Sequence, residues 1–247
     1  MGFVVNNTTK CGLLDLVCPH SCRGCGQLGA ALCECCKKDI YKHYEPICPI
    51  CKKSFAKKLE DVGGGEMGVQ KSKKNVNILN KCPDCESVFE GLWVVGWREG
   101  VLKKIVEEYK YQSVWAMGAF LAELLDFVLP KDLEVVVVPL PTIGKHVRER
   151  GLDHTWRVGR KLAKRRGWKC ERLLVRVVDT VQVGANVKKR KTQAERAYAV
   201  ARRVEPEKSY LLLDDVWTTG STMLAAEKVL RAAGAERIYG AVVAVSR

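Results

Sequence analysis

From about residue 88 onward, short apolar runs alternate with longer stretches in which apolar residues recur every three or four positions. The short runs predict β-strands, and the longer stretches predict amphipathic helices. The predicted strands are residues 93–97, 134–139, 173–178, 210–213 and 238–245. The predicted helices are residues 101–109, 117–129 before Pro130, 153–166 before Gly167, and 223–233.

Strands and helices alternate along this part of the chain, which is the pattern of an α/β fold with a parallel sheet. The run at 134–139 contains four consecutive valines, as expected of a strand that is buried on both faces. Helices should then cover both faces of the sheet, with ligands bound at the carboxyl ends of the strands. We therefore predict an α/β domain over residues 91–247.

Cysteines dominate the N-terminal part of the chain. Eleven of the twelve lie between Cys11 and Cys85, and eight of them form four Cys-x-x-Cys pairs. Each pair offers two thiolates to one tetrahedral ion, so four pairs predict two zinc sites with four cysteines each. Iron–sulfur ligation is the alternative, because the same ligand sets serve both. The predicted ligands are Cys22, Cys25, Cys33, Cys36, Cys48, Cys51, Cys82 and Cys85.

The spacing of the pairs does not determine how they combine. We favour sequential pairing, first with second and third with fourth, because each combination closes a short ribbon. Residues 57–81 are rich in Gly, Lys and Asn and would then form a flexible insertion in the second ribbon. Cys11, Cys18, Cys35 and His20 remain as spare or alternative ligands. Residues 1–90 are thus predicted to form a small Cys-rich double zinc-ribbon module.

The charge of the chain favours a polyanionic partner, since 42 Lys and Arg against 28 Asp and Glu give a formal net charge of +14. No uncharged apolar run reaches about 18 residues, so no transmembrane segment is expected. Residues 1–10 lack the basic-then-apolar layout of a signal peptide. Abundant cysteines without an export signal favour metal binding in a reducing compartment, so a cytoplasmic location is expected.

The stretch from Tyr210 to Thr222 carries the strongest chemical signal: an apolar strand ends in two acids, a Thr/Gly loop follows, and a helix begins. Unpaired backbone N–H groups at a helix start bind phosphate. Carboxylates at a strand end accept hydrogen bonds from vicinal hydroxyls or help to hold a magnesium-bound substrate. The combination fits a ribose 5-phosphate group.

This stretch resembles the motif with which type I phosphoribosyltransferases bind phosphoribosyl pyrophosphate (PRPP). The resemblance assigns the two acids to the ribose hydroxyls, assigns the loop to the 5′-phosphate, and implies magnesium bound with PRPP. The implied PRPP-binding residues are Asp214, Asp215, Val216, Thr218, Thr219, Gly220, Ser221 and Thr222. Neither a Walker A nor a GxGxxG motif occurs, which argues against a P-loop NTPase and a dinucleotide-binding fold.

The chain as a whole resembles the ComF (ComFC-like) family, in which a double zinc ribbon precedes a phosphoribosyltransferase-type domain. The similar motifs are residues 13–19 with the first two cysteine pairs, residues 110–111, 138–141 and 148–152, and the PRPP motif. The resemblance implies a type I phosphoribosyltransferase-like parallel sheet with helices on both faces. It also implies a role in DNA uptake during natural competence, with other competence proteins as partners.

The same resemblance implies a pyrophosphate loop at residues 138–142, and it identifies no catalytic residue. Its candidate ligands are Pro139, Leu140, Pro141, Arg148 and Arg150, with Lys145 nearby. The chain departs from the family where Arg150-Gly-Leu-Asp-His154 replaces Arg-Gly-Phe-Asn-Gln, and in residues 182–196, which are expected to form a mobile hood. His146 and His154 are candidate general bases, although isolated histidines in a basic surface segment are more often bystanders.

The sequence is compatible with three functions. The first is a PRPP-binding ComF-type protein, with or without phosphoribosyl transfer. The second is a phosphoribosyltransferase for a small acceptor, with a purely structural zinc ribbon. The third, argued from the cysteines alone, is a redox or iron–sulfur carrier. Basic clusters are interspersed with aromatic residues such as Trp156 and Trp168. Because such surfaces bind phosphates and stack on bases, single-stranded DNA is a further expected partner.

Overall fold

The computed structural model describes residues 21–42, 44–54, 82, 84–85, 87–112, 115–142, 153–177 and 197–247. Within these ranges, no helix has both the length and the apolar character that a membrane span requires. Several features singled out in the sequence lie outside the described residues. They are Cys11, Cys18, His20, the insertion at 57–81, Lys145, His146, Arg148, Arg150 and the loop at 182–196.

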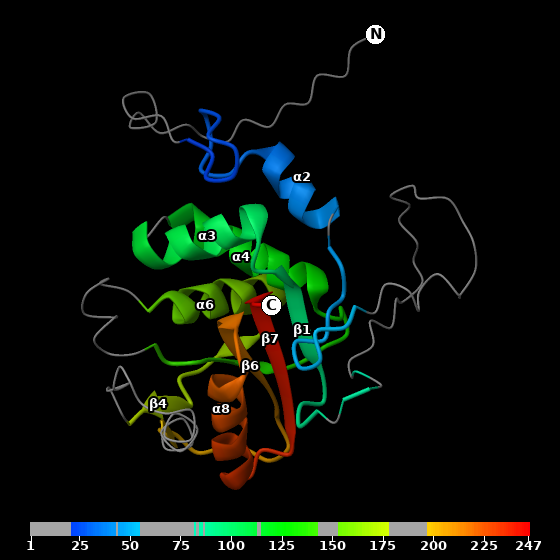
Figure 1. Cartoon of the computed structure of the whole chain (residues 1–247). Helices are drawn as coiled ribbons and strands as arrows, with labels where there is room; N and C mark the ends of the chain where they lie inside the picture. Colours follow the sequence, from blue (N-terminus) through cyan, green and yellow to red (C-terminus); the bar gives the residue numbers. More distant parts are fainter. Residues whose placement is uncertain are drawn as a thin grey trace.

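Five parallel strands form the central sheet, in the order β1-β7-β6-β2-β3 (Figure 1). This arrangement confirms the predicted α/β class with a parallel sheet. The strands are β1 (Leu92–Trp97), β2 (Val136–Pro139), β3 (Lys169–Cys170), β6 (Ser209–Trp217) and β7 (Arg237–Val245). The helices are α2 (Glu34–Lys42), α3 (Gly100–Gln112), α4 (Trp115–Val128), α6 (His154–Arg166) and α8 (Ser221–Ala232).

Strand β6 explains why the predicted strands are apolar at nearly every position. Leu211 and Leu213 belong to the buried cluster that contains side chains of α3, α4 and α6. Tyr210 and Leu212 belong to a second cluster, which contains side chains of α8. Successive side chains of a strand point to opposite faces, so a continuously apolar strand must be covered on both sides. The predicted helices on both faces are therefore confirmed.

One predicted strand lies outside the parallel sheet. The strand predicted at 173–178 is the shorter β4 (Leu174–Arg176), which pairs antiparallel with β5 (Tyr198–Val200) in a separate two-stranded sheet. Leu173, Leu174 and Tyr198 bury their side chains in the cluster on the α8 side. A short apolar run is compatible with either sheet, and its partner, a three-residue strand, is too short to produce a readable pattern.

The cysteine-rich segment packs directly against the α/β domain. The Tyr41 hydroxyl of α2 donates to Oε1 of Glu123 at 2.9 Å, and the Tyr41 ring lies 4.9 Å from that of Phe127. Cys22 and Cys36 are buried in the same cluster as the side chains of α3 and α4. Figure 1 shows α2 beside α3, on the outer side of the helical layer. The division of the chain near residue 90 stays a prediction.

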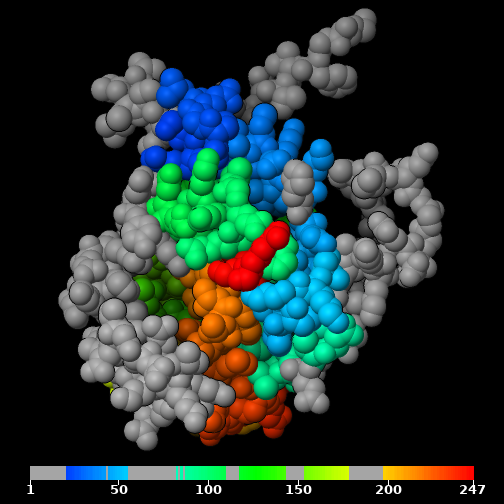
Figure 2. Space-filling model, in the orientation of Figure 1, coloured from blue at the N-terminus to red at the C-terminus, as the bar shows by residue number. Residues whose placement is uncertain are grey.

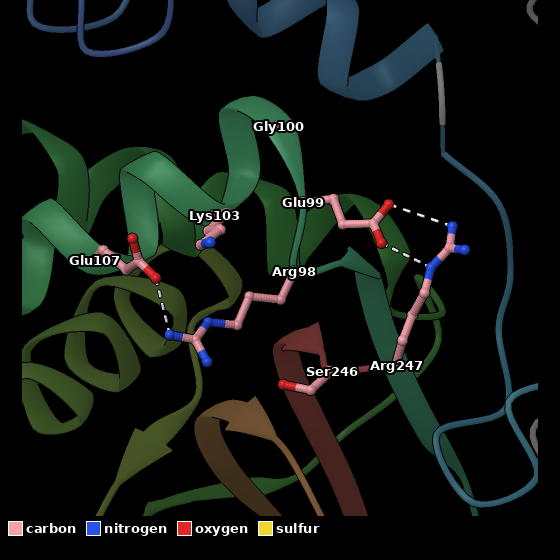
Figure 3. Close-up of a pocket in the computed structure, with 7 residues that line it drawn as sticks. All are labelled: Arg98, Glu99, Gly100, Lys103, Glu107, Ser246 and Arg247. Carbon is pink, nitrogen blue, oxygen red and sulfur yellow. Dashed lines mark hydrogen bonds and ion pairs between the residues drawn. The ribbon is translucent and has the colours of Figure 1, made fainter.

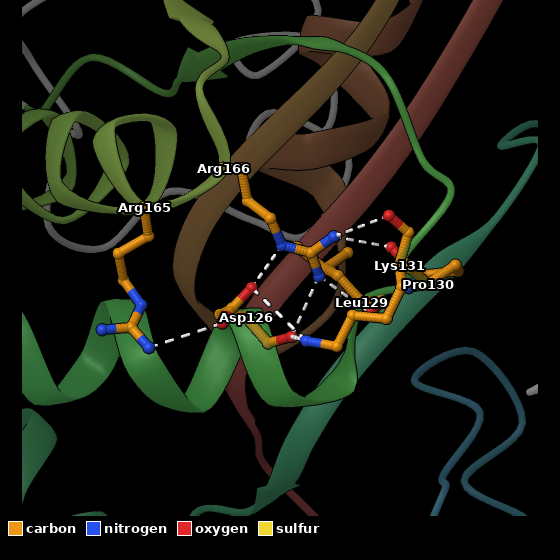
Figure 4. Close-up of polar contacts among 6 residues, drawn as sticks. All are labelled: Asp126, Leu129, Pro130, Lys131, Arg165 and Arg166. Atoms are coloured by element: carbon orange, nitrogen blue, oxygen red, sulfur yellow. Dashed lines mark hydrogen bonds and ion pairs between the residues drawn. The ribbon is translucent and has the colours of Figure 1, made fainter. Parts of the chain in front are cut away.

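Arg166 joins the end of α6 to the end of α4 (Figure 4). Its guanidinium donates to the carbonyl oxygens of Asp126 (3.0 Å), Leu129 (3.0 Å) and Pro130 (2.8 Å), and also to the Asp126 carboxylate. Burial of Asp126 opposes its ionisation, but the Arg166 guanidinium outweighs this effect and holds the pKa of that carboxyl below its ordinary value. Arg166 thereby satisfies the carbonyl of Asp126, in the last turn of α4, and those of the two residues that follow the helix.

Replacing Arg166 by alanine should lower the free energy of unfolding by about 2–4 kcal/mol, because several buried acceptors lose a charged donor together. Arg165→Ala is the matched control. The Arg165 side chain is 46% exposed and contacts Asp126 at 3.5 Å, whereas the Arg166 side chain is 9% exposed. The control should cost less than about 1 kcal/mol. Urea unfolding of both variants measures the difference, and equal losses would contradict the structural role of Arg166.

Candidate functional site

The four cysteine pairs form two clusters with the predicted sequential pairing. In each cluster the four sulfur atoms lie within 4.8 Å of one another. The first cluster is Cys22, Cys25, Cys33 and Cys36, and the second is Cys48, Cys51, Cys82 and Cys85. The adjacent Cys35 is exposed and lies outside both clusters, so Cys36 is the second cysteine of its pair.

The sulfur positions fit a tetrahedral ion. Zn–S bonds of about 2.3 Å in a tetrahedron separate two sulfurs by about 3.8 Å. The Sγ atoms of Cys25 and Cys33 lie 3.6 Å apart, and those of Cys51 and Cys82 lie 3.7 Å apart. Backbone N–H groups point at the sulfurs, for example from Cys33 to Cys22 at 3.3 Å. Such donors stabilise thiolates, the form in which cysteine binds metal.

The first and third cysteine pairs are the same structural unit, repeated 26 positions apart in the sequence. The Gly26 N–H donates to the Cys22 carbonyl at 2.7 Å, and the Lys52 N–H donates to the Cys48 carbonyl at 2.9 Å. Gly26 and Lys52 both have positive φ, 82° and 64°. A lysine in this conformation is uncommon and marks a backbone held by its surroundings. Our sequence interpretation counted the four Cys-x-x-Cys pairs but did not identify this repeat.

Cys170 is a different kind of cysteine. It is half-buried on β3, lies outside both clusters, and burial raises the pKa of its thiol to about 12. Its thiol therefore stays protonated at neutral pH.

The PRPP-type motif spans the end of β6, a tight turn and the start of α8. Strand β6 is longer than predicted and continues through Asp214 and Asp215 to Trp217. Both acids are half-buried, and they line one small pocket together with Tyr109 and His154. The Asp215 N–H donates to Oδ1 of Asp214 at 2.8 Å, which orients that carboxylate. The two carboxylates thus lie at the carboxyl end of the sheet, as expected.

The turn between β6 and α8 consists of Thr218, Thr219 and Gly220, and the motif's last two residues lie in the first turn of α8. Gly220 has a φ of 75°, and a Cβ placed on it would lie 2.1 Å from the buried Trp217 ring. Only glycine fits there. Gly220 offers no side chain to cap α8, and the Ser221 N–H donates to the Thr219 hydroxyl at 3.4 Å. The next amides of the helix are open to a phosphate.

The candidate pyrophosphate loop runs beside the acids. Pro139, the last residue of β2, pairs with Leu213, and the Leu140 N–H donates to the Leu213 carbonyl at 2.9 Å. The residues that follow Pro139 therefore begin next to Asp214. Asp153 accepts hydrogen bonds from the Trp156 N–H at 3.1 Å and from the Thr142 hydroxyl at 3.3 Å. It caps α6 and holds the end of the loop, a role that the asparagine usual in the family could also fill.

His154 is not a surface residue, which corrects the expectation drawn from its basic sequence context. Its side chain is 3% exposed, and its ring lies 5.0 Å from that of Tyr109. The Tyr109 hydroxyl donates to the His154 carbonyl at 3.2 Å. Burial raises the pKa of Tyr109 to about 12, and the nearby Asp153 and Asp215 add to this rise. Our sequence interpretation did not assign Tyr109 to the site, since it looked like one more apolar position of a helical stripe.

Two curated proteins are similar to this chain along most of its length. Competence protein F of Haemophilus influenzae is 25% identical over 237 residues, covering 90% of this chain and 93% of that protein. Competence protein ComFC of Streptococcus pneumoniae is 23% identical over 222 residues, covering 85% of each. No family model matches the chain.

A solved structure described as the allosteric regulatory enzyme of purine biosynthesis matches with a TM-score of 0.40 and 19% identity. That match covers 56% of this chain and 30% of the other. The similarity to the competence proteins, by contrast, extends over both halves of the chain, and the two four-cysteine clusters have the predicted pairing. Along most of its length the chain is therefore similar to these two competence proteins, and its structure joins two four-cysteine clusters to a parallel α/β sheet.

Proposed function

We propose that this chain is a cytosolic, zinc-containing protein that binds PRPP with magnesium and acts in DNA uptake during natural competence. One observation carries the PRPP part. Asp214 and Asp215, the start of α8, and the loop after Pro139 lie together at one end of the sheet. Carboxylates there would accept the ribose hydroxyls and help to hold magnesium, while the α8 amides would bind the 5′-phosphate.

Zinc is the metal that the two clusters fit best. Four thiolates at tetrahedral spacing form a closed structural site, with no position left for a substrate. The same ligands could hold iron–sulfur clusters, and metal analysis of the purified protein separates the two. Two zinc ions per chain support the proposal, whereas a brown, iron-containing protein would favour an electron carrier.

The direct test of PRPP binding is calorimetric titration of the full, zinc-loaded chain with PRPP, with and without magnesium. Saturable binding that strengthens with magnesium is expected, because the metal neutralises the pyrophosphate next to two carboxylates. If PRPP does not bind under either condition, the proposal is wrong. Release of pyrophosphate in the presence of candidate acceptors would extend the proposal to phosphoribosyl transfer.

The competence role rests on the two similar proteins and predicts weak, salt-sensitive binding of single-stranded DNA. Reversing the charges of Lys188, Lys189 and Arg190, which lie outside the described residues, should weaken binding in fluorescence anisotropy measurements. The matched control reverses Lys37, Lys38 and Lys42 of α2. An equal loss in both variants would indicate a general charge effect, and affinity that does not change with salt would contradict a phosphate-driven mode.

A further inference from the structure

A second cleft opens at the carboxyl ends of β1 and β7, with a volume of about 500 Å³ (Figure 3). A cleft of this size can hold a ligand as large as a mononucleotide. Its charged lining consists of three cations, Arg98, Lys103 and Arg247, and two acids, Glu99 and Glu107. In Figure 2 the C-terminal end of the chain lies on the surface between α3 and the segment around residue 50.

The two acids of the cleft are already neutralised. Arg98 Nη2 lies 2.9 Å from Glu107, and Arg247 Nε lies 2.7 Å from Glu99. Lys103 is the third cation of the cleft, and no acid of the described residues forms an ion pair with its exposed ammonium group. The Nε of Arg98 is buried and has no hydrogen-bond partner among the described residues. The cleft therefore presents one unpaired positive charge, that of Lys103, because a buried Nε does not face a ligand in the cleft.

The start of α3 adds backbone donors to this charge. Gly100, its first residue, lines the cleft, and the first turn of the helix carries no acidic side chain. Glu99 precedes the helix and could cap it, but its carboxylate pairs with Arg247 instead. Figure 3 shows the Glu99 side chain turned toward Arg247 and away from Lys103. The positive end of the helix dipole is thus left for an external anion.

The cleft is connected to the PRPP motif through the backbone. Ser246, which lines the cleft, donates its N–H to the carbonyl of Trp217 at 2.9 Å. Trp217 is the last residue of β6, immediately before the Thr218–Gly220 turn. The Ser246 carbonyl in turn accepts from Nζ of Lys52, beside the second cysteine cluster, at 2.5 Å. One residue therefore joins the cleft, the PRPP motif and the second cluster.

We propose that this cleft is a second phosphate site, which binds a phosphate monoester separately from the turn at Thr218–Gly220. A monoester dianion matches an unpaired ammonium and an open helix start, in a cleft that Arg98 and Arg247 also line and that is large enough for a nucleotide. The monoester belongs either to a free mononucleotide or to the 5′-end of a DNA strand. This site does not depend on PRPP binding, because it shares no residue with the PRPP motif.

The test is a titration of ¹⁵N-labelled, zinc-loaded full-length protein with inorganic phosphate, followed by amide chemical shifts. The amides of Gly100 and Val101 report on the cleft, and those of Ser221 and Thr222 report on the PRPP motif. Saturable shifts at the α3 amides are expected. Lys103→Glu should weaken that binding about tenfold, since it replaces an attractive charge by a repulsive one, while Lys103→Arg should retain it. Lys164→Gln, on the exposed face of α6, is the control and should change nothing.

Each outcome decides one site. If the α3 amides do not shift, or shift equally in Lys103→Glu, the cleft is not a phosphate site, whatever happens at Ser221. If the α3 amides shift and the α8 amides do not, the cleft is a phosphate site, and the PRPP proposal is decided separately by the titration with PRPP. Adenosine monophosphate and an oligothymidylate with a 5′-phosphate or a 5′-hydroxyl then separate the two sources. A cleft that binds neither phosphorylated compound more tightly than inorganic phosphate would contradict the monoester assignment.

Discussion

Replacing both Cys48 and Cys51 by serine should remove one of two zinc ions and lower the free energy of unfolding by at least about 3 kcal/mol. Structural zinc contributes about 10–16 kcal/mol to the folding of zinc-finger peptides, so this expectation is conservative. For a chain of this size, 1 kcal/mol shifts Tm by about 2–4 °C, which gives a fall of about 6–12 °C. Atomic absorption and thermal unfolding measure the two effects.

The loss should extend beyond the cluster itself. Ile47, directly before Cys48, is 3% exposed and belongs to the buried cluster on the α8 side of the sheet. Lys52, directly after Cys51, donates to the carbonyl of Ser246 at the end of the chain. We therefore expect the double variant to disturb the carboxyl end of β7, visible as shifted amides at Ser246 and Arg247.

Cys35→Ser is the control for this experiment, because Cys35 is exposed and lies outside both clusters. It should keep two zinc ions and an unchanged Tm. Two zinc ions per chain in the Cys48/Cys51 double variant would refute the assignment of these cysteines as ligands.

Replacing both Asp214 and Asp215 by asparagine should weaken PRPP binding at least about tenfold. Each charge-assisted hydrogen bond contributes about 1.5–3 kcal/mol, and 1.4 kcal/mol corresponds to one decade of affinity. Losing even one such bond therefore reaches the expected effect. Calorimetry with magnesium present measures it, and circular dichroism with thermal unfolding checks that the half-buried asparagines leave the fold intact.

A second double variant separates the site from the charge of the protein. Asp132→Asn with Glu134→Gln also removes two negative charges, from exposed positions between α4 and β2. This control should bind PRPP as tightly as the parent. A folded Asp214/Asp215 double variant that also binds like the parent would leave the PRPP proposal without its central support.

Features built from neighbouring residues could be predicted from the sequence. The motif at 210–222 could be read as strand, turn and helix, because apolar run, glycine and helix start follow one another directly. The helix that ends at Arg166 could also be predicted from the sequence. Asp153 accepts from the Trp156 N–H at its start, and Gly167 has a φ of 72° at its end. Capping and turn preferences act within a few residues, so the sequence contains them in full.

Features made by distant residues could not be read in this way. The sulfurs of Cys51 and Cys82 meet across 31 positions, and the sequential pairing was a preference until the structure brought them together. The burial of His154 beside the two acids was missed, because the sequence around it is rich in basic residues, whereas Tyr109 and Leu213 line the same small pocket as His154.

The sequence by itself thus determined the α/β class, the cysteine pairs and the acidic strand end with its glycine turn. Only the tertiary structure decided the strand order, the separate sheet of β4 and β5, and the cleft whose wall Arg98 and Arg247 share. Local patterns follow from hydrogen bonds and apolar spacing within one element. Strand neighbours and charge pairs such as Glu99 with Arg247, 148 positions apart, depend on which elements pack together. Which elements pack together is decided by the free energy of the whole chain, through burial and pairing, and no single segment determines it.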